Sequence, residues 1–173
     1  MRNNALSVAN YFISLADRDS KPLTQLGLMK RVYIAHGFSL AIRKKSLLND
    51  KYDRVEAWKY GPVIPSVYHS FKHFKANPIT DMTVIGKWDP EKNQFDFETP
   101  ILEDPEAQKI VEMVWKRYSD FSDSDMVKLT HKSGTPWSVC HVENMNNQIP
   151  DEITELYYRR IVESVMSKPG TNE

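Results

Sequence analysis

The chain has 173 residues, 40% apolar and 27% charged, a mixture typical of one globular domain rather than a disordered or membrane-spanning chain. Acidic and basic residues balance at 23 each, which excludes a general attraction to nucleic acid or to an anionic membrane and permits a homo-oligomer. One cysteine, Cys140, excludes an internal disulfide, and with no signal-peptide pattern at the start of the chain we expect a cytoplasmic protein.

Two helices are predicted in the first quarter of the chain. Apolar residues at helical spacing indicate one helix over about Ala5–Ala16 and a longer one over about Thr24–Lys44. The Thr24 hydroxyl can accept a hydrogen bond from an amide of the first turn. Apolar residues surround most of the second helix, which predicts a central position, and Gly27 and Gly37 would allow a neighbouring element to approach closely.

The middle of the chain is predicted to mix short strands with one helix. Val55–Trp58 indicates a short extended segment, which the following Tyr-Gly-Pro run ends. Pro65 suits the first turn of a third helix over about Pro65–Lys75. Met82–Ile85 and Phe95–Phe97 have β-type composition and are separated by the turn-rich segment GKWDPEKNQ, so we expect a small hairpin.

Helices return in the last third. Asp104 before Pro105 predicts the start of a fourth helix, and Ser122 the start of a short fifth one. Thr135 begins a further turn, and the last helix is predicted over about Asp151–Ser167.

Together these elements predict a mainly α fold. We expect a compact helical domain of about six helices with a short strand and a small β-hairpin. Residues 1–168 are predicted to form a single domain, and residues 169–173 a flexible C-terminal tail.

Three stretches carry more information than the helical patterns. They are LGLMKRVYIAHG at 26–37, EAWKYGPVIPSVYHSF at 56–71 and LTHKSGTPW at 129–137. In this order and spacing they resemble the Panacea (SocA-like antitoxin) family over about Ala5–Val165. The middle stretch is the most specific, because Trp-x-Tyr-Gly-Pro followed by Pro-x-x-Tyr is not a general helix pattern. The chain differs from the family at Met29 and His36, where glutamine is frequent.

The resemblance implies a place in toxin–antitoxin systems, which phages and other mobile elements often encode. It implies a protein-binding module that neutralises a cognate toxin by direct binding, or that acts as a proteolytic adaptor and delivers the toxin to a protease. A phage or mobile-element protein that binds a host factor is an alternative. The partner-binding or motif residues are Lys30, Tyr33, Glu56, Trp58, Tyr60, Pro62, Pro65, Tyr68, His131 and Trp137.

The aromatic residues of the middle stretch allow two interpretations. Trp58, Tyr60 and Tyr68 can be core side chains that stabilise a strand–turn–helix junction, since aromatic side chains bury large areas. They can also be partly exposed anchors for a partner, because Trp and Tyr dominate binding hot spots. Both interpretations can hold at once.

Lys30 lies in a mostly apolar helix, where an unpaired charge would be costly. We expect an ion pair with Glu56 or Asp53. The alternative is a polar cluster of Lys30, Glu56, Tyr60 and His131 that serves a ligand or a reaction, which would make the protein an enzyme.

No other pattern predicts chemistry. His69 and His73 have a spacing that can bind metal, but no glutamate lies between them, and we expect them to face solvent. We interpret Cys140 as a packed thiol. Phosphate-binding loops and nucleotide fingerprints are missing, so we expect no catalytic residue, cofactor or metal, and no nucleic-acid or membrane partner.

Overall fold

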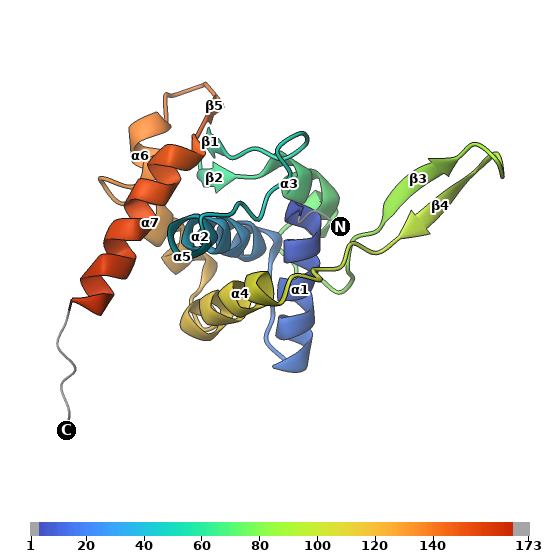
Figure 1. Ribbon diagram of the computed structural model, residues 1–173, viewed down its shortest axis with the longest axis horizontal. Helices are drawn as coiled ribbons and strands as arrows, with labels where there is room; N and C mark the ends of the chain where they lie inside the picture. Colours follow the sequence, from blue (N-terminus) through green and yellow to red (C-terminus); the bar gives the residue numbers. More distant parts are fainter. Residues whose placement is uncertain (1–3, 168–173) are drawn as a thin grey trace.

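The computed structural model describes residues 4–167 and shows a mainly α fold with two small antiparallel sheets (Figure 1). This confirms the predicted fold class. The expected tail, residues 169–173, lies outside the described residues. The helices of the described part are α1 (Ala5–Arg18), α2 (Gln25–Arg43), α3 (Pro65–Phe71), α4 (Pro105–Tyr118), α5 (Asp123–His131), α6 (Pro136–Cys140) and α7 (Asp151–Met166).

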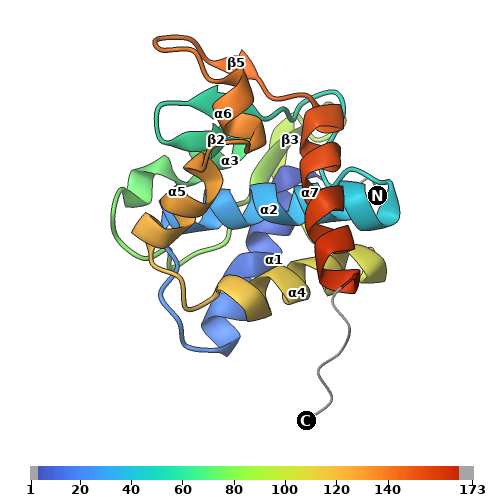
Figure 2. The ribbon, with the colours of Figure 1, turned by 90° about the vertical axis from the view of Figure 1, so that its left-hand side faces the viewer.

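Helix α2 lies at the centre of the molecule, as its sequence predicted. The other long helices surround it, with α1 and α4 on one side and α5 and α7 on the other (Figures 1 and 2). Its residues are buried from Leu28 to Leu40 without interruption. Its N-terminus begins at the predicted cap, where the Thr24 hydroxyl accepts a 3.1 Å hydrogen bond from the amide of Gly27.

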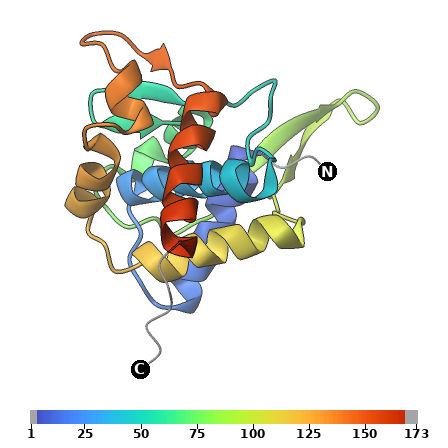
Figure 3. The same cartoon turned by 60° about the vertical axis from the view of Figure 1, so that its left-hand side comes forward.

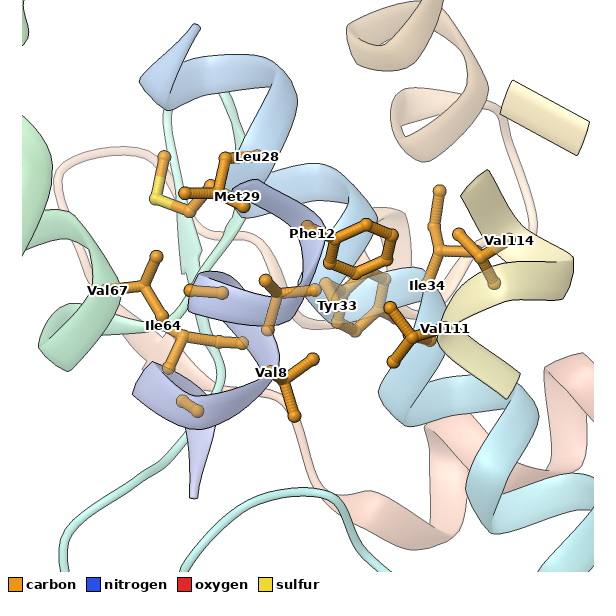
Figure 4. Packing of buried hydrophobic residues seen from close by; sticks show 14 of the residues in the cluster. Val8, Phe12, Leu28, Met29, Tyr33, Ile34, Ile64, Val67, Val111 and Val114 are labelled. Atoms are coloured by element: carbon orange, nitrogen blue, oxygen red, sulfur yellow. The ribbon is translucent and has the colours of Figure 1, made fainter. Parts of the chain in front are cut away.

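The hydrophobic core forms where α1, α2, α3 and α4 meet. Phe12 of α1 lies close to Val111 and Val114 of α4, while Val67 of α3 closes the opposite end (Figure 4). Because each helix presents one apolar face, the core is continuous across elements that are far apart in sequence.

Side-chain caps set most of the remaining helix starts. Asp104 accepts hydrogen bonds from the amides of Glu106 and Ala107, and Ser122 forms a capping box with Asp125. Helix α3 is shorter than predicted, because the chain tightens into a 3₁₀ turn at Lys72–Phe74.

A three-stranded sheet, in the order β2-β1-β5, packs against α2 through β2. Strand β1 (Glu56–Trp58) pairs antiparallel with β2 (Gly61–Val63) on one side and with β5 (Asn147–Gln148) on the other. The sequence predicted β1 alone. Strands β2 and β5 are too short, and contain too much Gly, Pro, Asn and Gln, to be recognised from composition.

The second sheet is a hairpin that projects from the helical body (Figure 1). Its strands are β3 (Ile85–Asp89) and β4 (Gln94–Glu98), with Trp88 opposite Phe95. The predicted range of the first strand, Met82–Ile85, is wrong, because β3 begins at Ile85, where the prediction ended. The residues GKWD, predicted as part of the linker, form β3 because they pair with β4.

Candidate functional site

The most specific sequence motif forms a tight bend between β1 and β2. Trp58 pairs with Gly61, which leaves Lys59 and Tyr60 as the loop. Gly61 has φ of +103°, a conformation that residues with a side chain rarely adopt. Pro62 follows in β2, and Pro65 begins α3. This explains the Tyr-Gly-Pro run: the glycine supplies the backbone conformation that closes the bend.

Lys30 of α2 lies directly beneath this bend. It is 0% exposed, and its Nζ donates a 3.0 Å hydrogen bond to the carbonyl of Pro62. A Cβ at Gly61 would lie only 2.7 Å from Nζ. Burial lowers the pKa of Lys30 to about 7. Glycine is therefore required at position 61, because a side chain there would block the Lys30 amine from the Pro62 carbonyl of β2.

The expected ion pair of Lys30 is wrong. Glu56 instead accepts hydrogen bonds from Arg54 and from the indole of Trp58, the latter at 2.7 Å. Asp53 accepts bonds from the amides of Ala5 and Asn49, 2.9 Å each. A carbonyl satisfies Lys30 because burial favours a neutral amine, which can still donate a hydrogen bond.

Helices α5 and α6 hold the bend from its other side. His131 places Nδ1 2.8 Å from the carbonyl of Val127 and Nε2 3.3 Å from that of Lys59. Trp137 donates from Nε1 to the carbonyl of Trp58 at 2.7 Å. The rings of His131 and Trp137 lie 3.9 Å apart, so they support each other.

The three motif stretches thus converge on one length of backbone. Lys30 and Trp137 donate to the carbonyls of Pro62 and Trp58, and Nε2 of His131 lies 3.3 Å from the carbonyl of Lys59. A loop whose backbone is bound at so many points keeps one conformation. The sequence did not predict that these side chains hold the backbone of the bend. Every residue has a carbonyl, so residue type does not show which carbonyl accepts a hydrogen bond.

The other motif residues divide between the bend and the core. Tyr68 packs edge to face on Trp58 at 5.0 Å, which joins α3 to the bend. Tyr33 lies one turn further along α2, buried against Tyr158 of α7 and away from the bend. Tyr60 points outward with 64% of its surface exposed.

The hypothetical polar cluster is only partly assembled. Lys30 and His131 both lie beside Gly61, but Glu56 turns toward Trp58 and Arg54, and Tyr60 faces solvent. With its amine sealed from solvent, Lys30 is placed to hold the bend and not to meet a substrate.

Two surfaces were missed from the sequence. Trp88, Phe95 and Phe97 share one exposed face of the β3–β4 hairpin, which their alternate spacing could have indicated. Exposed Met113 and Val165 border a groove between α4 and α7. They lie at the margin of otherwise ordinary amphipathic helices, so no sequence signal separates them from core residues.

No helix within residues 4–167 is both long enough and apolar enough to cross a membrane.

Comparison with known proteins agrees with the geometry. The chain matches the family described as "Antitoxin SocA-like, Panacea domain" over residues 28–138, which run from α2 to α6 and include the whole bend and its supports. Antitoxin SocA of Caulobacter vibrioides (strain NA1000 / CB15N) is 32% identical over 139 residues, which cover 79% of this chain and 69% of that protein. No solved structure matches. The chain therefore belongs to the SocA-like antitoxin family that is defined by the Panacea domain.

Proposed function

We propose that this protein is an antitoxin that neutralises a cognate toxin by binding it directly, with the bend and the adjoining part of α3 up to Tyr68 as the docking surface. Family membership supports this, because an antitoxin has a protein partner and membership suggests a role other than catalysis. The burial of Lys30 supports it further, since its amine is closed to a substrate.

The observation that carries the proposal is the exposed tip of a rigid bend. Tyr60 stands out from the surface beside Lys59, whose Nζ lies 5.4 Å from the centre of the tyrosine ring. Tyrosine is enriched in binding hot spots because it supplies a large contact area with few rotatable bonds. The bound carbonyls beneath it reduce the entropy that binding would otherwise lose.

Co-expression with the product of the neighbouring gene tests the proposal. We expect that product to stop growth alone, and this protein to restore growth and to co-purify with it. Tyr60→Ala should weaken binding about tenfold or more, as loss of an aromatic hot spot does. Tyr52→Ala is the matched control, because Tyr52 is 72% exposed but lies outside the bend.

A neighbouring product that is harmless alone, or that remains toxic without co-purifying, would contradict the antitoxin proposal. Equal effects of Tyr60→Ala and Tyr52→Ala would move the docking surface away from the bend. The half-life of the toxin in the same cells separates two mechanisms, since masking leaves it unchanged and delivery to a protease shortens it.

A further inference from the structure

An open apolar groove forms a second surface, away from the bend. It lies where the end of α7 passes α4 and the end of α2 (Figures 2 and 3), and its volume is about 720 Å³. Ile42 of α2, Met113 of α4 and Val165 of α7 contribute to its walls. We call it the α4–α7 groove.

The walls of the α4–α7 groove are apolar surfaces that no other described part of the chain covers. Ile42, Met113 and Val165 are all exposed. Contiguous exposed apolar surface with a concave shape is typical of a docking site, because a soluble protein gains stability by covering it. Within residues 4–167 the groove is therefore left open.

The shape of the groove suits a helix. Its residues on α4 include Lys109, Met113 and Lys116, at a spacing of four and then three, so it follows that helix for about two turns. Ile161 and Val165 line it from α7, which crosses α4 (Figures 2 and 3). A partner helix that lies along α4 can place its apolar stripe in this groove.

The charges around the groove identify the kind of helix. Lys109, Lys116 and Arg117 line it, with Glu112 as the single carboxylate among its lining residues. Lys109 forms a 2.7 Å ion pair with Glu106. Glu112 also accepts a 2.6 Å hydrogen bond from the hydroxyl of Tyr11. Lys116 and Arg117 therefore make their end of the groove cationic although the whole chain is neutral, and this end attracts carboxylates.

We propose that the α4–α7 groove binds an amphipathic α-helix of a partner protein that carries acidic residues beside its apolar stripe. The stripe covers Ile42, Met113 and Val165, and the carboxylates meet Lys116 and Arg117. The inference goes beyond toxin binding at the bend, because the groove is built from other elements and requires no toxin.

Two synthetic helical peptides of about 18 residues test the inference, long enough to span the groove. Both carry the same leucine stripe, flanked by glutamate in one and by lysine in the other. With the complete protein, fluorescence anisotropy should show the glutamate peptide binding at least about tenfold more tightly, with an affinity that falls as salt is added. Equal affinities, or no binding of either peptide, would overturn the inference.

Variants locate the binding. Met113→Glu and Val165→Glu should each abolish binding of the glutamate peptide. Leu156→Glu should retain it, because Leu156 is an exposed apolar residue of α7 outside the groove lining. Circular dichroism checks that each variant is folded.

Charge reversal gives a test that does not disturb the apolar walls. Lys116→Glu combined with Arg117→Glu should make the protein prefer the lysine peptide. An unchanged preference would contradict the proposal. Sedimentation that shows a dimer dissociated by Val165→Glu would also overturn it, since a second copy of the chain would then be the occupant. Growth rescue by the antitoxin is a separate readout, so this inference and the proposed function can fail independently.

Discussion

At the scale of single residues, Lys30 connects the core to the bend. Its amine is buried, donates to the Pro62 carbonyl and has its pKa lowered to about 7. An amine can donate this hydrogen bond with or without its positive charge, so the bond persists when the proton leaves. What changes with pH is the free energy of keeping a charge in an apolar site.

This gives a pH dependence with a definite sign. The folded pKa, about 7, lies below the ordinary value of 10.5, so the unfolded chain binds more protons between these values. The free energy of unfolding should therefore rise with pH, by about 2 kcal/mol from Lys30 between pH 7 and pH 9. Urea unfolding at several pH values should show this rise, and Lys30→Met should remove that contribution. The same slope in both proteins would contradict the assignment.

Gly61 allows a second test at this scale. Gly61→Ala combines a φ of +103° with a Cβ placed 2.7 Å from the Lys30 amine. We expect a loss of roughly 2–4 kcal/mol of unfolding free energy, measured by urea denaturation. Gly134→Ala is the control, because φ there is +82° but nothing lies within 4 Å of the new Cβ. It should lose only about 1 kcal/mol. Equal losses of unfolding free energy in the two variants would show that the contact between a Cβ at position 61 and the Lys30 amine costs nothing.

At the scale of elements, the contact between α2 and α7 depends on a glycine in the middle of a helix. The ring of Tyr158 rests against Gly37, where a Cβ would lie 2.2 Å from Cδ2. The same ring packs edge to face on Phe38 at 4.9 Å and on Tyr33 at 6.1 Å. Gly37 thus lowers helix propensity but leaves room for the Tyr158 ring of α7 against α2.

Gly37→Ala should destabilise the protein by about 1–3 kcal/mol, because α7 must move to relieve the overlap. Gly27→Ala on the same helix is the matched control. The atoms nearest its Cβ are the ends of the Arg31 and Asp123 side chains and not an aromatic ring of α7. Since both variants gain about 1 kcal/mol of helix propensity, the difference between their urea midpoints isolates the Tyr158 ring. Stabilisation by Gly37→Ala would refute this packing.

At the scale of the whole molecule, one side chain anchors the projecting hairpin to the body. Asn10 of α1 donates to the carbonyls of Thr83 and Pro100 at 3.0 and 3.1 Å, and accepts a 3.0 Å bond from the amide of Thr83. A two-stranded hairpin alone is only marginally stable. Its position relative to the helices therefore depends on this buried amide.

Asn10→Ala should leave the helical body folded but speed trypsin cleavage at Lys87 and Lys92 of the hairpin by about tenfold. Two backbone carbonyls and one amide lose their partner, and local opening becomes easier. Asn147→Ala is the control, since Asn147 holds a different loop through the carbonyl of Cys140. Mass spectrometry of the early fragments gives the rates. Equal cleavage in the two variants would show that Asn10 does not anchor the hairpin.

Local patterns determined much of this protein. Periodic apolar residues predicted the long helices, and Thr24, Asp104 and Ser122 marked their starts, because capping depends on residues only three positions apart. The three motif stretches likewise led to the correct family.

Only the tertiary structure decided which groups meet across the chain. The carbonyl of Pro62, and not Glu56, satisfies Lys30, and Tyr33 belongs to the contact with α7 and not to the bend. The strand GKWD and the α4–α7 groove likewise depend on pairing and packing between distant segments. Such contacts depend on how whole elements pack, and backbone acceptors are the same in every residue, so sequence could not specify them.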